Sequence, residues 1–136
     1  MSDEQKAAPE ETQTLAEKVD AFLTMHHRVV EDFKRSLGNA RHFIELAQRA
    51  MEREPTETAQ MLEEIRSYRL HEFLTEQYEN FRHMAGFLEG AADSLERSDI
   101  PGECNELAES YEALLTESTA QEEIMDKLLS SLRNPH

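Results

Sequence analysis

The 136-residue sequence contains one cysteine, no tryptophan, four glycines and four prolines. With Cys104 alone, an internal disulfide is excluded, so nothing here requires an oxidising compartment and we expect a cytoplasmic protein. Because glycine and proline are scarce, few residues break helices, and the abundant Glu, Leu and Ala are good helix formers. The composition therefore predicts an all-α fold.

Positive charge and long apolar runs are also scarce. The chain has 14 Lys and Arg against 29 Asp and Glu, a formal net charge of −15. No stretch reaches the roughly 18 apolar residues of a membrane span, and the first residues lack the apolar run of a signal peptide. So acidic a chain repels nucleic acid and anionic membranes unless basic residues gather on one face. We therefore expect neither as a partner.

The prolines divide the chain into long uninterrupted stretches. Residues 12–53, 56–98 and 101–134 each lack an internal proline. Such stretches predict three long helices in a single domain, residues 12–134, preceded by a flexible acidic tail, residues 1–11. Because short connections make neighbouring helices antiparallel, the sequence predicts an elongated up-down-up antiparallel bundle with coiled-coil-like packing.

The first predicted helix carries three adjacent apolar columns with a seven-residue repeat. A face of this width is sufficient to contact two neighbours. Gly38 and Asn39 do not disturb the repeat, so we expect a continuous helix with a weak point there; the alternative is a bend that gives a four-helix count. The columns are Val19, His26, Phe33, Ala40 and Ala47; Leu15, Phe22, Val29, Ser36, Phe43 and Ala50; and Ala16, Leu23, Val30, Leu37, Ile44 and Met51.

The second predicted helix takes Thr56 as its N-cap. Its main apolar face runs from His71 to Leu95, whereas the first turns use Met61 and Leu62. The apolar positions therefore shift around the helix before they keep to one face. The third predicted helix begins near Pro101 and alternates its core positions by three and four residues. These positions are Cys104, Leu107, Tyr111, Leu114, Ser118, Gln121, Met125, Leu128 and Leu132.

Polar residues occupy several expected core positions near the middle of the bundle. His26 lies in the first helix, Gln77 and Tyr78 in the second, and Ser118 and Gln121 in the third. A buried polar layer fixes register and partner number at some cost in stability, and we favour this role for His26. Because an ordinary histidine pKa is near 6.5, a partly buried His26 predicts assembly that responds to pH between about 5 and 7.

A metal site is the first alternative. In an antiparallel hairpin His26 lies near the level of Met84 and His83, and thioether with imidazole suits a soft ion such as Cu(I). Glu79, four residues before His83, offers a zinc pair on the outer face. No Glu-x-x-His occurs in the chain, and the carboxylates of the second helix point outward, which disfavours a di-iron site. We expect no cofactor, with a transition metal ion as the alternative.

Phosphotransfer is the second alternative. His83 is expected on the surface and is followed by Gly86 and Gly90, an arrangement that resembles histidine phosphotransfer domains in a few residues. The lysine that such domains carry after the histidine is absent, and Arg82 is the nearby cation. Close helix packing is the structural explanation for the two glycines. For Cys104, at a core position, we expect a structural role, and we predict no catalytic residue.

The sequence thus favours a non-enzymatic helical protein–protein interaction module, an adaptor, regulator or chaperone-like protein. We expect it to self-associate, with a dimer favoured, because the wide apolar faces need covering. The acidic excess lies on the second and third helices, with ten acids against four bases in residues 54–98 and eight against two in residues 101–133. A protein partner of this surface is therefore expected to be basic. A metal-binding bundle and a phosphotransfer-like bundle stay open as alternatives.

Overall fold

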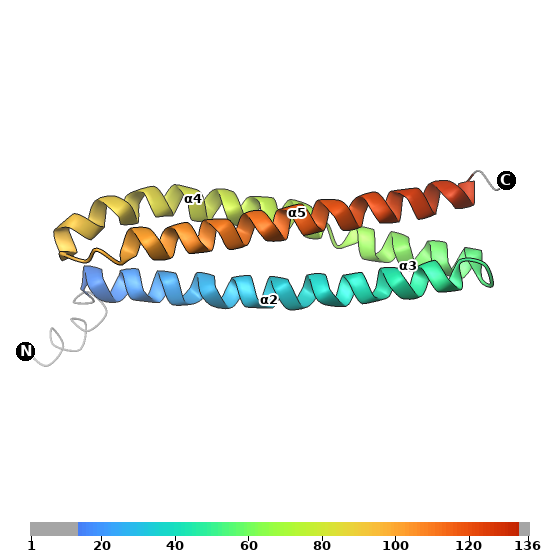
Figure 1. Cartoon of the computed structure of the whole chain (residues 1–136), viewed down its shortest axis with the longest axis horizontal. Helices are drawn as coiled ribbons and strands as arrows, with labels where there is room; N and C mark the ends of the chain where they lie inside the picture. Colours follow the sequence, from blue (N-terminus) through green and yellow to red (C-terminus); the bar gives the residue numbers. More distant parts are fainter. Residues whose placement is uncertain (1–13, 134–136) are drawn as a thin grey trace, which may run out of the picture.

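The computed structural model describes residues 14–133, so the predicted tail, residues 1–11, and the predicted end of the last helix at Asn134 and Pro135 lie outside the described residues. The expectation of an all-α protein of long helices packed against one another is confirmed (Figure 1). The helices among these residues are α2 (Leu15–Ala50), α3 (Pro55–Ser67), α4 (Leu70–Leu95) and α5 (Ile100–Arg133).

Helix α2 is continuous over 36 residues, as expected. At about 1.5 Å per residue it extends roughly 54 Å. It begins after Thr14, whose Oγ1 accepts a hydrogen bond from the Glu17 backbone N–H at 3.1 Å. Gly38 lies inside the helix, and among residues 14–133 a Cβ at this position would meet no atom of another element within 4 Å, so no close approach requires a glycine there. The alternative bend near Gly38 is therefore not the source of the additional helix.

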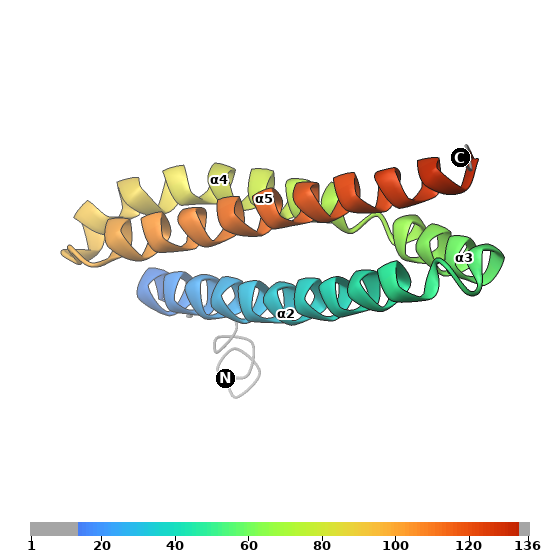
Figure 2. The ribbon, with the colours of Figure 1, turned by 45° about the vertical axis from the view of Figure 1, so that its right-hand side comes forward.

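The additional helix arises because the second predicted helix is divided into α3 and α4. Arg69, between them, has φ 52° and ψ 41°, in the left-handed region. Leu62 of α3 and Leu74 of α4 are both fully buried. Twelve residues on an unbroken helix would place these two side chains about 120° apart. The left-handed residue resets the helical phase, so that both leucines reach the core. Figure 2 shows the break in the ribbon between α3 and α4.

The helix starts differ in detail from the predictions. The prediction of Thr56 as an N-cap is wrong, because α3 begins at Pro55 and Glu54 holds the cap position without a side-chain hydrogen bond. Thr58 is buried instead, and its Oγ1 donates to the Glu54 carbonyl at 2.7 Å. Proline at the first helical position needs no hydrogen-bond acceptor for a backbone N–H, which explains the earlier start. Pro101 lies in the first turn of α5, as expected.

The core consists of two clusters along the length of the molecule. The larger one joins α2, α4 and α5 and contains aromatic side chains such as Phe33, Phe81 and Tyr111. The smaller one joins α2, α3 and α5. Helix α5 packs extensively against both α2 and α4, whereas α2 and α4 approach each other only sparsely. The smaller cluster consists of Ile44, Ala47, Leu62, Met125 and Leu129, so Leu129 takes the buried position expected for Leu128, which is half-buried.

The turn between α4 and α5 is fastened to the start of α2. Arg97 Nη1 lies 2.6 Å from Asp20 Oδ1, and Arg97 Nη2 lies 2.9 Å from Asp99 Oδ2. The hydrogen bonds to Asp99 and Asp20 raise the pKa of Arg97, and the bond from Arg97 lowers the pKa of Asp99. Asp20 thus links the turn to the start of α2, while Asp99 holds the Arg97 side chain within the turn. No helix among residues 14–133 combines the length and the hydropathy that crossing a membrane requires.

Candidate functional site

His26 lies in the larger cluster and is 4% exposed. Its Nδ1 is 2.8 Å from the hydroxyl of Tyr111, which is itself fully buried. The imidazole also contacts Phe22 and Phe81, with ring centroids 4.4 and 5.2 Å away. Burial, and then the charge of His27, lower the pKa of His26, while burial raises the pKa of Tyr111 to about 12. The neutral imidazole is therefore the form that this aromatic surrounding stabilises.

The other polar core residues do not join His26 in one layer. Ser118 is buried seven residues, about 10 Å, beyond Tyr111 along α5. Gln121 Nε2 donates to the Leu37 carbonyl at 2.9 Å. Ser118 and Gln121 line a cavity of about 30 Å³ together with His71, whose buried Nδ1 has no hydrogen-bond partner among residues 14–133. The expectation of a common layer with His26 is therefore wrong, and this polar band separates the two core clusters.

The four residues of the hypothetical metal site differ in their surroundings. His26 is buried and bonded to Tyr111, whereas Glu79, His83 and Met84 are exposed on α4. Within residues 14–133, no group of three or more His, Cys, Asp and Glu side chains is placed to hold a metal ion. A Cu(I) pair of His26 with Met84, or a zinc pair of Glu79 with His83, stays a prediction that these positions do not strengthen.

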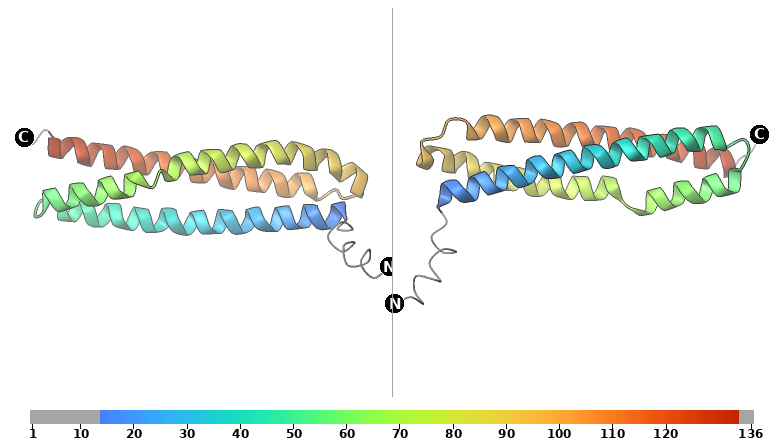
Figure 3. Two further views of the ribbon diagram at one scale, coloured as in Figure 1. Left: turned by 180° about the vertical axis from the view of Figure 1, so that it is seen from behind. Right: turned by 90° about the horizontal axis from the view of Figure 1, so that it is seen from below.

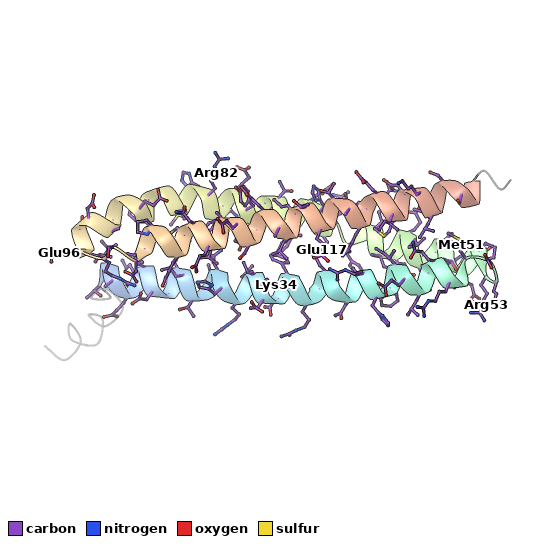
Figure 4. The ribbon with its side chains drawn as sticks, viewed as in Figure 1. Lys34, Met51, Arg53, Arg82, Glu96 and Glu117 are labelled. Atoms are coloured by element: carbon purple, nitrogen blue, oxygen red, sulfur yellow. The ribbon has the colours of Figure 1, made fainter. Side chains whose placement is uncertain are left out.

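His83, the residue of the phosphotransfer hypothesis, is exposed on α4, and Arg82 beside it points away from the bundle (Figure 4). The structural explanation for the nearby glycines is wrong. Within the part of the chain that the structure describes, a Cβ added at Gly86 or at Gly90 would meet no atom of a neighbouring helix within 4 Å, so close helix packing does not require either residue. Cys104 is buried, and burial raises the pKa of its thiol, which opposes a nucleophilic role.

An apolar groove of about 370 Å³ lies where α2 faces α3 and the start of α4. Phe43 of α2 lies on one side of it. On the other side lie Met61 and Ile65 of α3 and Tyr68 at the end of that helix. Tyr68 is 79% exposed because it directly precedes the left-handed Arg69, where the chain leaves α3. The break between α3 and α4 thus shapes the groove as well as the core.

Comparison with protein-family models, curated proteins and solved structures finds no match for this chain. The surface itself is therefore the source of any functional argument.

Exposed apolar side chains continue from the groove along the side shared by α2 and α4, the face seen from behind in Figure 3 (left). Phe73 is 51% exposed although its ring packs edge-on against Phe33, with centroids 5.7 Å apart. Met84 and Phe87 follow Phe73 by 11 and 14 residues, close to whole numbers of helical turns, and so share its face. We call these exposed side chains the apolar stripe: Met25, Phe43, Met61, Tyr68, Phe73, Met84 and Phe87.

The apolar columns of α2 explain why the stripe exists. Two of the three columns are largely buried, including Leu23, Leu37 and Ile44. The column of Phe22 and Phe43 lies toward the sparsely packed α2–α4 side, where Phe22 is half-buried and Phe43 is exposed. The sequence shows that the apolar face of α2 is wide. It did not predict the groove, because neither a glycine nor a proline marks the break between α3 and α4 at Arg69.

Proposed function

We propose that this chain is a non-enzymatic helical protein–protein interaction module, an adaptor, regulator or chaperone-like protein that also self-associates. The observation that carries the proposal is the groove between α2 and α3, which continues into the apolar stripe on α4. A large contiguous apolar patch is rare on a soluble monomer and is typical of a surface that another protein covers. A helix laid into such a groove buries apolar side chains at spacings of three and four residues.

The proposed arrangement is the up-down-up antiparallel bundle, in which α3 and α4 together form the middle limb. Two observations support it. The connections at residues 51–54 and 96–99 are short. The course of the chain in Figures 1 and 3 runs along α2, returns along α3 and α4, and runs outward again along α5. In this arrangement α2 and the middle limb lie side by side, and both contribute side chains to the apolar stripe.

The charge of the chain restricts the proposed partners. Helices α4 and α5 carry most of the acidic excess, so we propose protein partners with basic rims and neither nucleic acid nor membrane. Figure 4 shows Lys34 and Glu117 where α2 meets α5, on a different side from the stripe. We propose a cytoplasmic location, which the free and buried Cys104 supports because the fold depends on no disulfide.

Affinity capture with two matched baits tests the proposal. Phe43→Ala removes a side chain from the groove, whereas Ile124→Ala removes an equally exposed apolar side chain from α5. We expect proteins from the native cell to be retained by the wild-type and Ile124→Ala baits and lost from Phe43→Ala. Retention of the same proteins by all three baits, or no retention above a blank matrix, would contradict the proposal. Circular dichroism of each bait confirms that the fold is intact.

A further inference from the structure

We infer that the apolar stripe binds a second copy of this chain. The two copies lie face to face and are related by a two-fold axis parallel to the helices. The inference rests on the proposed function, because it names the surface through which the module self-associates. In this dimer, α2 of each copy lies on α4 and α3 of the other, and the outer apolar column of α2 becomes buried.

The chain itself limits what can cover the stripe. Residues 1–13 contain Met1 and two alanines as their apolar residues, too few to fill the groove from within the same molecule. A second copy brings a stripe of equal length. From the level of Phe87 to that of Met61 the stripe runs about 40 Å. At a width of about 20 Å it offers roughly 800 Å² per copy, the amount that a stable interface buries on each partner.

Charge selects the orientation of the two copies. Helix α2 has six basic and five acidic residues, a net charge of +1, whereas α4 has one basic and five acidic residues, a net charge of −4. An axis along the helices places α2 on the partner copy's α4. An in-plane axis across the helices would instead place α4 on α4, where like charges repel. The first orientation is therefore the one that the charges favour.

Ring contacts give the axial register between α2 and α4. His26 contacts Phe81 at 5.2 Å, Phe33 contacts Phe73 at 5.7 Å and Phe22 contacts Phe81 at 6.2 Å, so residues at one level have numbers that sum to about 105. Rotation about an axis along the helices leaves every residue at its own level. Phe43 of one copy therefore lies near the level of the groove residue Met61 in the other.

The same register places opposite charges at similar heights on the facing helices of the dimer. Arg28 is level with Glu79, and Arg35 is level with Glu72, all four being exposed. Asp32 lies within one helical turn of the level of Glu76, a like-charge pair that the neighbouring Arg28 and Arg35 offset. These levels predict intermolecular ion pairs from α2 of each copy to α4 of the other.

The first experiment measures the dimer dissociation constant of the full chain by sedimentation velocity over a wide concentration range. We expect a wild-type dimer, an about tenfold or greater loss of affinity in Phe43→Ala and in Met25→Ala, and no change in the matched control Ile124→Ala. The substituted side chains are partly exposed, so the monomer fold is expected to survive, which circular dichroism checks.

The second experiment tests the orientation by charge reversal. The double variant Arg28→Glu with Arg35→Glu, and separately Glu72→Arg with Glu79→Arg, are each expected to weaken the dimer about tenfold. The quadruple variant, with opposite charges exchanged between the helices, is expected to restore the wild-type affinity. Restoration is the decisive result, because a merely destabilised monomer would not regain affinity.

The possible outcomes separate this inference from the proposed function. A dimer that Phe43→Ala and Met25→Ala leave intact would overturn the inference and retain self-association through another surface. If both double variants weaken the dimer and the quadruple variant does not restore its affinity, the orientation with the two-fold axis along the helices would be overturned. A wild-type chain that stays monomeric would overturn both the inference and self-association, while the capture experiment decides separately whether the groove binds another protein.

Discussion

The two ends of this molecule are built from the same α2 and α5 but differ in the segment packed against them. Around α4 the core contains Phe81, Tyr111 and Phe33, and this segment is 26 residues long. Around α3 the core is small, and the segment is 13 residues long. Since helix stability in proteins comes mainly from packing of an apolar face, α3 is expected to open more easily than α4.

The largest effect on stability is expected from a substitution in the core around α4. Phe81 is 1% exposed, so Phe81→Ala removes a buried ring at the centre of the larger cluster. We expect a loss of about 4 kcal/mol of unfolding free energy, measured by urea denaturation. Phe87→Ala, measured at concentrations where the chain is monomeric, is the matched control on the same helix, because that ring is 62% exposed, and should cost less than about 0.5 kcal/mol. Similar losses in the two variants would contradict the assigned core.

At the α3 end, Leu62→Ala should cost about 3 kcal/mol, because this side chain is fully buried in the smaller cluster. The comparison of the two ends predicts where the loss appears. Hydrogen exchange in α3 should accelerate strongly, while amides in the middle of α4 should change much less. A uniform acceleration through both helices would show that the two clusters unfold as one unit.

A smaller loss is expected from one oxygen atom at the α4 end. Tyr111→Phe keeps the ring and removes the hydroxyl that bonds His26 Nδ1 at 2.8 Å. A buried imidazole nitrogen without a partner should cost about 1–2 kcal/mol in unfolding free energy. In Tyr78→Phe the lost hydroxyl bonds Glu112 at the surface, so a cost under about 0.5 kcal/mol is expected. Thermal or urea unfolding of both variants makes this comparison.

Gly90→Ala should strengthen α4 and so widen the difference between the ends. The glycine lies within the helix with open space around its Cβ position, so alanine introduces no clash. We expect a gain of about 0.5–1 kcal/mol, measured as a raised urea midpoint. The gain should appear in α4 amides and leave exchange in α3 unchanged. A destabilised Gly90→Ala variant would indicate a contact to this face that the single chain does not show.

The smallest effect on stability is expected from a change in pH. Burial lowers the pKa of His26 in the folded protein below its ordinary value of 6.5, so the unfolded chain binds the proton more readily. Stability is therefore fully present above about pH 6.5 and is lost as the pH falls through the lowered pKa of the folded state. Urea midpoints measured from pH 7.5 downward should show this loss in the wild type and in the control His83→Gln. In His26→Gln the loss over this range should be reduced.

Much of the core could be predicted from the sequence because it depends on local periodicity. The seven-residue repeat identified Val19, Leu23 and Leu37 as core residues, and all three are buried. The division of the second helix was missed, although the phase difference between Leu62 and Leu74 was present. Local propensity does not mark this break, because Arg69 is neither glycine nor proline and adopts the left-handed conformation in response to packing on both sides.

The candidate site was less predictable for the same reason. The sequence placed His26 in the core but paired it with the level of Ser118 and Gln121, whereas its partner is Tyr111, 85 positions away along the chain. Axial offsets between helices depend on turn lengths and side-chain volumes, which a single helix pattern does not encode. An error of two turns on α5 therefore changes the partner without changing which residues are buried.

The sequence was sufficient to predict that residues 14–133 form long amphipathic helices, since helix-forming composition and apolar periodicity are local properties. It also determined that α2 is nearly neutral while α4 and α5 are acidic. Which apolar side chains stay exposed depends on how the helices pack. Because α5 packs against both α2 and α4 while the backbones of those two helices approach each other only sparsely, Phe43 of α2 and the α4 side chains of the apolar stripe stay exposed.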